Sequence, residues 1–151
     1  MANFRVADRV MCGGTKVNAE FPKATETNGA YTMICVVDDD ESVRDSFRTL
    51  LESHGFTVTT YASGREMLAD ERHHQAGFLI IDQHMPAMNG LATLGVLRRE
   101  GSSVPTIMIT GRLDAEITEQ AATLDVAAIL EKPFSTARLI ELIRAHRRAN
   151  Q

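Results

Sequence analysis

The feature that most constrains the fold is an alternation between short apolar runs and longer amphipathic stretches. The chain contains five such runs, at residues 33–37, 56–61, 78–81, 106–109 and 126–130. Four of them are almost continuously apolar, which is typical of strands buried on both faces of a sheet, whereas the run at 56–61 is partly polar and suits a sheet edge. Between the runs, apolar residues recur with the spacing of a helix.

This alternation predicts a (βα)5 architecture, an α/β fold in which five parallel strands form a doubly wound sheet with helices on both faces. The crossovers between successive strands are expected to be right-handed. The clearest helical stripe runs through residues 43–54, and Gly55 is placed to end that helix.

Length and charge limit the classes of protein that the chain can belong to. With 151 residues, of which 44% are hydrophobic, it can form one globular domain with a substantial core. A net charge of −4 argues against binding nucleic acid or an anionic membrane through a general positive field.

Cys12 and Cys35 form neither a metal-binding spacing nor a disulfide framework. No apolar run approaches the ~20 residues that span a bilayer, so we expect a cytoplasmic protein with no direct contact to nucleic acid or membrane.

Residues 1–30 differ from the rest of the chain. They combine glycine, proline, asparagine and threonine with isolated apolar residues, and no strand or helix period persists there. We therefore expect a flexible N-terminal extension over residues 1–30, followed by one domain over residues 31–149. The sequence leaves open whether this extension is native.

Polar side chains follow four of the apolar runs, at the point where each strand is expected to end. In open α/β sheets the functional site lies outside the carboxyl ends of the strands. If the first, third, fourth and fifth strands are neighbours, these side chains converge. They are Asp38, Asp39 and Asp40 after the first run, Asp82 after the third, Thr110 after the fourth and Lys132 after the fifth.

This set of side chains is suited to phosphoryl transfer. Asp38, Asp39 and Asp82 in one pocket would repel one another unless a cation neutralised them. Oxygen donors with room for water favour Mg²⁺. Thr110 and Lys132 could then supply a hydroxyl donor and a positive charge to the oxygens of a phosphoryl group. Asp40 is more simply explained as the cap of the first helix.

Four motifs in this order resemble a response-regulator receiver domain of two-component signalling. They are VVDDDESVR at 36–44, IDQHMPAMNG at 81–90, ITG at 109–111 and EKPF at 131–134. The resemblance covers about residues 33 to 149 and is nearest in its motifs to nitrogen-fixation and LuxR-type regulators. It implies a flavodoxin-like sheet with strand order 2-1-3-4-5.

The resemblance also implies a role for each acidic residue. Asp82 would be the phosphoacceptor, forming an acyl phosphate with a group received from a histidine kinase or a phosphotransfer protein. Asp39 would bind Mg²⁺ directly and Asp38 through water, with Asp82 and the backbone carbonyl of His84 completing the protein ligands. Such a protein is a phosphoacceptor rather than an enzyme, with at most self-phosphorylation and self-dephosphorylation activity.

Further roles follow from the same resemblance. Thr110 would donate a hydrogen bond to the phosphoryl group, and Lys132 would pair with its charge. The Lys132–Pro133 bond is expected to be cis, a form that X-Pro bonds reach at low cost. His84 and Arg112 occupy positions where the family tunes the lifetime of the phosphoryl group, although both could also be ordinary polar surface residues.

Two positions depart from the family pattern. The family usually has an aromatic residue three positions before the lysine, at the switch position where the ring moves on activation, and this chain has Ile129. A glycine is usual where this chain has Asp125, a residue that tolerates a left-handed backbone better than most. We therefore expect intact phosphorylation chemistry with altered activation machinery.

The sequence leaves several outputs open. The leading interpretation is a switch that binds a downstream protein through the face formed by the fourth helix, the fifth strand and the fifth helix, and a homodimer is left open. One alternative is a docking module that works without phosphorylation, and another is a receiver fragment of a longer DNA-binding transcription regulator. A Mg²⁺-dependent phosphatase is disfavoured because residues 82–84 lack an Asp-x-Asp pair.

Overall fold

A computed structural model describes residues 33–149 of the chain, and the extension expected over residues 1–30 lies outside them. The strands are β1 (Met33–Val37), β2 (Thr57–Tyr61), β3 (Phe78–Asp82), β4 (Thr106–Thr110) and β5 (Ala128–Glu131). The helices are α3 (Glu41–Ser53), α4 (Gly64–Ala69), the short 3₁₀ helix η1 (Glu71–Gln75), α5 (Gly90–Arg99), α6 (Ala115–Thr123) and α7 (Thr136–Ala149).

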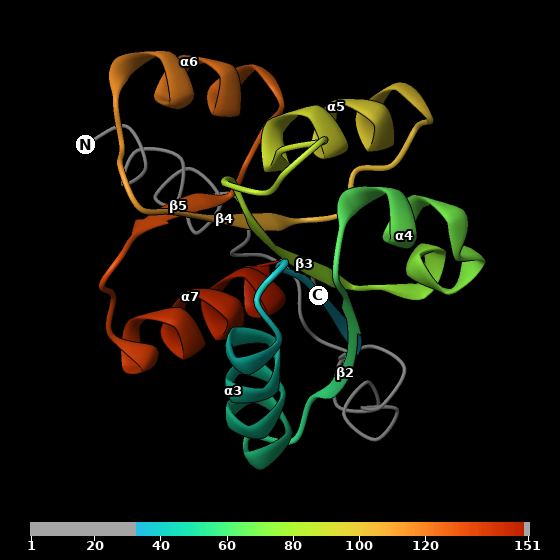
Figure 1. Cartoon of the computed structure of the whole chain (residues 1–151). Coiled ribbons are helices and arrows are strands. Elements are labelled where there is room, and N and C mark those ends of the chain that lie inside the picture. The colour runs from blue at the N-terminus through green and yellow to red at the C-terminus, as the bar shows by residue number, and fades with distance from the viewer. Residues whose placement is uncertain (1–32, 150–151) are drawn as a thin grey trace.

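The five strands form one parallel sheet in the order β2-β1-β3-β4-β5. This order confirms the predicted α/β architecture and the order that the resemblance implies. Helices α3 and α7 cover one face of the sheet, and α4, α5 and α6 cover the other (Figure 1). Each face has its own apolar cluster, one containing Phe47, Leu51 and Leu139 and the other containing Met67 and Leu94.

The burial of the strands follows the predicted pattern. Every residue of β1, β3 and β4 is buried, as expected for strands with helices on both faces. Strand β2 lies at the sheet edge and is only partly buried. Arg48 of α3 donates to the Val58 carbonyl at 3.2 Å and to Thr60 Oγ1 at 3.1 Å. A charged side chain thus covers part of the edge, which is one way that proteins discourage pairing with another chain.

Within residues 33–149, two non-glycine residues adopt a left-handed backbone. Asp125, in the loop before β5, has a φ of 59°, in agreement with its place at a usual glycine position. Ala87, in the loop after β3, has a φ of 69°. Alanine has no polar side chain to support this conformation, which costs roughly 1–2 kcal/mol for an L-residue. The sequence did not predict a left-handed backbone at Ala87, because alanine is not among the residues typical of such turns.

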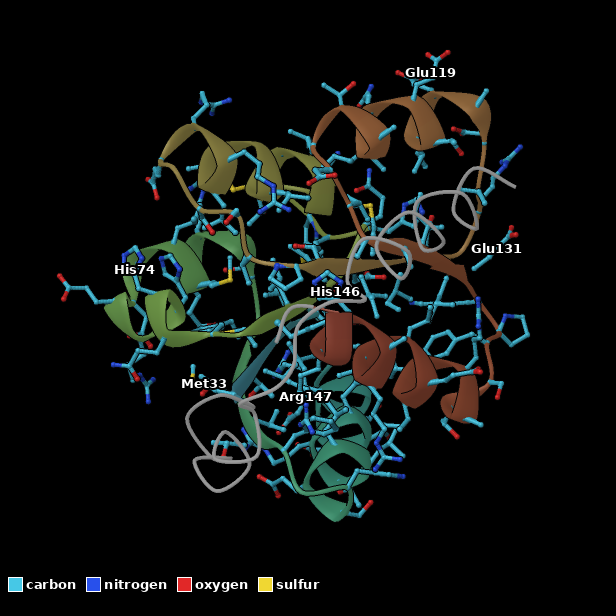
Figure 2. All side chains as sticks on the ribbon, turned by 180° about the vertical axis from the view of Figure 1, so that it is seen from behind. Met33, His74, Glu119, Glu131, His146 and Arg147 are labelled. Atoms are coloured by element: carbon cyan, nitrogen blue, oxygen red, sulfur yellow. The ribbon has the colours of Figure 1, made fainter. Side chains whose placement is uncertain are left out.

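The last turn of α7 packs against the sheet through two basic side chains. His146 and Arg147 are labelled there in Figure 2. The His146 ring meets Phe78 of β3 edge-on, with centroids 5.5 Å apart. The Arg147 guanidinium lies 5.5 Å from the centre of the Phe56 ring, within the range of a cation–π contact. These contacts hold the end of α7 against the amino-terminal end of the sheet.

We predict that His146 makes folding sensitive to mild acid. Burial lowers the pKa of its imidazole from the ordinary value of 6.5, with Asp125 opposing this shift, so the folded state favours the neutral ring. The resulting stability is present above the unfolded-state pKa and is lost as the pH falls through the lower folded-state pKa. His146→Phe should therefore reduce the loss of unfolding free energy between about pH 7.5 and about pH 5.5, measured with urea.

The matched control is His54→Phe, at an exposed histidine at the end of α3. A pH dependence reduced as much by His54→Phe as by His146→Phe would show that burial of the ring is not the cause. Equal pH dependence in His146→Phe and the wild type would contradict the assignment to His146.

Candidate functional site

Parallel pairing brings the predicted polar residues together at the carboxyl edge of the sheet. Asp38 directly follows β1, Asp82 ends β3, and β1 and β3 are neighbours. Each of Asp38, Asp39 and Asp82 offers a carboxylate oxygen, and these oxygens lie within 4.8 Å of one another. The convergence that the sequence predicts for the three carboxylates is therefore present.

Asp82 lies at the centre of this site. Its side chain is only 4% exposed, and its Oδ1 lies 3.2 Å from the Nζ of Lys132, whose side chain is 42% exposed. Burial raises the pKa of Asp82, while the positive charge of Lys132 opposes this shift. The buried Asp82 carboxylate thus faces the ammonium group of Lys132, which solvent can reach.

The loop between β1 and α3 fixes the other two carboxylates. Asp38 is buried, and its Oδ1 accepts a hydrogen bond from the Asp40 amide at 2.9 Å. Burial raises the pKa of Asp38, and the nearby charge of Asp82 adds to the rise. Arg44 donates to the Asp38 carbonyl at 2.7 Å, and Asp40 caps α3 through the amides of Ser42 and Val43.

These observations place the members of the first motif in different roles. Asp40 acts as the helix cap that the sequence predicts, and hydrogen bonds from Ser42 lower its pKa. Arg44 belongs to the quoted motif, but sequence reasoning gave it no role. Its contact with the Asp38 carbonyl holds the loop from which the acidic side chains project. The exposed Asp39 is the carboxylate of the three that solvent reaches most readily.

Three neighbouring carboxylates, two of them buried, fit a hard cation. Two of the three carboxylates are buried with raised pKa values, which is the electrostatic cost that a divalent ion would relieve. An oxygen-only set of this size matches the preference of Mg²⁺, which keeps part of its water shell. The donor chemistry is therefore consistent with the predicted Mg²⁺ site.

Gln83, which sequence reasoning missed, organises the loop after Asp82. Its amide donates to the Ile109 carbonyl at 2.8 Å, and its own carbonyl accepts from the Gly90 amide at 3.1 Å. Its buried side-chain Oε1 accepts from the Leu91 amide at 2.8 Å. Asn89 caps the same helix by accepting from the Ala92 amide. The start of α5 is thus tied to the residue next to Asp82.

Thr110 is joined to both predicted tuning residues. Its hydroxyl lies 3.0 Å from the Nε2 of His84, 3.0 Å from the Arg112 carbonyl and 3.2 Å from the Arg112 amide. His84 makes this contact with its side chain, whereas Arg112 makes it with its backbone. The sequence indicated both positions but not their direct bonds to Thr110.

The remaining predicted positions lie close to β5. The Lys132–Pro133 peptide bond is cis, as the resemblance implies. Ile129 is 2% exposed and packs in the apolar cluster under α4, α5 and α6. An aliphatic side chain thus fills the place where the family usually has an aromatic ring.

Gly90 leaves room for the backbone of the site. A Cβ added to Gly90 would lie 2.7 Å from the Asp82 carbonyl oxygen and 3.0 Å from the Gln83 Cα. Because both are backbone atoms, neither can turn away. We predict that Gly90→Ala lowers the unfolding free energy by about 1–3 kcal/mol, the usual cost of overpacking, as measured by urea unfolding.

Gly95 provides the matched control on the same helix. A Cβ there would meet only the end of the Arg99 side chain, at 3.7 Å. Gly95→Ala should raise the unfolding free energy by roughly 0.5–1 kcal/mol because alanine favours a helix interior. A Gly90→Ala variant as stable as the wild type would show that the loop can shift.

Among the described residues, no helix is long and apolar enough to cross a membrane.

Comparison with known proteins agrees with the fold and the motifs. Residues 34–144 match the family model described as the response regulator receiver domain. The chain is 37% identical over 110 residues to the transcriptional regulatory protein FixJ of Azorhizobium caulinodans, covering 73% of this chain and 52% of that protein. It is 35% identical over 109 residues to the C4-dicarboxylate transport transcriptional regulatory protein DctR of Rhodobacter capsulatus, covering 71% and 55%.

Solved structures give the same result. The crystal structure of FixJ-N has a TM-score of 0.69 at 32% identity, covering 76% of this chain and 92% of that one. The chemotaxis protein CheY4 of Vibrio cholerae has a TM-score of 0.70 at 27% identity, covering 75% and 96%. The chain spans about half the length of the two curated relatives described above. It belongs to the family of response-regulator receiver domains, the phosphorylation-dependent switches of two-component signalling.

Proposed function

We propose that Asp82 accepts a phosphoryl group from a histidine kinase or a phosphotransfer protein in a reaction that requires Mg²⁺. The observation that carries this proposal is the buried Asp82 carboxylate, with Asp38 and Asp39 within 4.8 Å and the Lys132 ammonium at 3.2 Å. Receiver domains generally bind Mg²⁺ at an acidic pocket, and this cluster supplies such a pocket.

Each residue has a distinct part in the proposed reaction. A carboxylate oxygen of Asp82 attacks phosphorus, and the bond from phosphorus to the donor breaks as the acyl phosphate forms. Lys132 Nζ pairs with the incoming negative charge, and the Thr110 hydroxyl donates to a phosphoryl oxygen. Asp39 directly, Asp38 through water, Asp82 and the His84 carbonyl would hold Mg²⁺, which offsets the charge of the carboxylates and of the phosphoryl oxygens.

The rest of the proposal concerns what phosphorylation does. We infer a cytoplasmic phosphoacceptor whose catalysis is limited to gaining and losing its own phosphoryl group. Its phosphorylation changes the affinity for a downstream protein that contacts α6, β5 and α7. Figure 2 shows Glu119 projecting outward from α6. Tuning by His84 and Arg112 remains a prediction, as does the altered role of the switch position at Ile129.

A second candidate is that the chain is the receiver part of a longer transcription regulator. FixJ and DctR are named as transcriptional regulatory proteins, and the chain covers only 52% and 55% of their lengths. In that case the output would be DNA binding by another part of the protein. The chemistry at Asp82 is the same for both candidates.

We predict that incubation with acetyl phosphate and Mg²⁺ adds one phosphoryl group to the wild-type chain, detected by intact-mass spectrometry. Asp82→Asn should give no adduct, because an amide is a far weaker nucleophile than a carboxylate. Chelation of Mg²⁺ should also abolish the adduct, since the crowded carboxylates would then lack a counter-charge.

Asp45→Asn is the matched control, because Asp45 is an exposed aspartate on α3. This variant should be phosphorylated like the wild type. No adduct on the wild type would favour a docking module that works without phosphorylation. An undiminished adduct on Asp82→Asn would show that another residue is modified.

A further inference from the structure

A side-chain hydrogen bond joins the loop after β3 to the end of β4. His84 lies in the loop between β3 and α5, and Thr110 ends β4, 26 positions later in the chain. The His84 Nε2 and the Thr110 Oγ1 are 3.0 Å apart. His84 is exposed, whereas Thr110 is fully buried. The exposed imidazole of His84 is therefore hydrogen-bonded to the buried hydroxyl of Thr110. In the proposed function, this hydroxyl donates a hydrogen bond to a phosphoryl oxygen.

The hydrogen-bonding capacity of the Thr110 hydroxyl is fully used. A threonine hydroxyl has one proton to donate and two lone pairs that accept. The Arg112 carbonyl can only accept, so the proton points to it at 3.0 Å. The Arg112 amide donates to one lone pair at 3.2 Å. Because the proton is committed to the Arg112 carbonyl, the contact with His84 at 3.0 Å requires the imidazole tautomer that carries its hydrogen on Nε2. The hydroxyl has no second proton to offer a phosphoryl oxygen.

Donation to a phosphoryl group requires the hydroxyl to leave this arrangement. Both bonds to Arg112 come from the backbone two residues later, in the loop that directly follows Thr110. The His84 bond comes from a different loop, whose position is fixed by the bonds of Gln83 to the Ile109 carbonyl and the Leu91 amide. His84 is thus the restraint on Thr110 that does not move with the Thr110 loop.

We propose that the His84–Thr110 hydrogen bond is a latch that holds the Thr110 hydroxyl in the position of the unphosphorylated protein. His84 is then a positioning residue that acts through Thr110 and weakens the binding of a phosphoryl group at Asp82. This inference rests on the proposed function, since it concerns the same site. In the unphosphorylated protein, the bond from His84 opposes movement of the Thr110 hydroxyl toward Asp82.

The latch can be tested with beryllofluoride, a phosphoryl mimic, in the presence of Mg²⁺. In His84→Phe a ring of similar shape has no nitrogen, so the latch is lost and the dissociation constant should fall by about two- to tenfold, the range that one hydrogen bond is worth. His84→Gln can place an amide donor near the same point and should bind more like the wild type. His74→Phe, at an exposed histidine on η1, controls for a general effect of the substitution.

A double-mutant cycle with Thr110→Val isolates the bond from other effects of His84. Valine keeps the shape of threonine without the hydroxyl, so adding His84→Phe to this variant should leave the dissociation constant unchanged. The same fall in both backgrounds would show that His84 acts elsewhere. In the unliganded protein, Thr110→Val should shift the ¹⁵N resonance of His84 Nε2, and an unmoved resonance would show that the bond does not form.

The possible failures are distinguishable. Wild-type protein that binds no beryllofluoride at Asp82 would overturn the proposed function, and the latch with it. Wild-type binding that His84→Phe leaves unchanged or weakens would overturn the latch and leave the proposed function in place.

Discussion

Parallel pairing of β1 with β3 is the constraint on which the site depends. Because the two strands run side by side in the same direction, the residues that follow them meet at one edge. This pairing brings Asp38 beside Asp82 and buries both carboxylates, which raises both pKa values. The fold therefore creates an electrostatic cost at this edge. The charge of Lys132, 3.2 Å from Asp82, offsets part of this cost, and a cation bound beside the accessible Asp39 would offset more of it.

Most of the fold could be predicted because it depends on patterns that are local in sequence. The nearly continuous apolar runs required strands buried on both faces, and the partly polar run at 56–61 suited the sheet edge, where β2 lies. The carboxylate site followed from the same logic, since Asp38 and Asp82 each stand directly after an apolar run. The order of the strands could not be predicted in the same way, because apolar patterning alone does not specify which strands are neighbours. That order was predicted from the family resemblance.

The features that sequence reasoning missed depend on where side chains point. Gln83 reads as one polar residue in a turn, yet its amide oxygen reaches the start of α5 eight residues later. Arg44 reads as a charge on a helix, yet it binds the Asp38 carbonyl. Ala87 adopts a left-handed backbone in the loop between β3 and α5, a conformation that alanine rarely adopts. Such tertiary contacts override local preference and leave no periodic pattern to detect.

The aliphatic Ile129 changes how movement at the site can reach the rest of the molecule. A buried isoleucine in a packed cluster has no ring to swing and no polar tip to expose, so it can only transmit a shift by repacking. Thr110, in contrast, bonds directly to the loops on both sides of it, through His84 and through the Arg112 backbone. Movement of the Thr110 hydroxyl would therefore break its contact with His84, in the loop before α5, and change its contacts with the Arg112 backbone, in the loop before α6. Under the proposed function, the hydrogen bonds of Thr110 to the Arg112 backbone would connect the site to the loop before α6 without an aromatic switch residue.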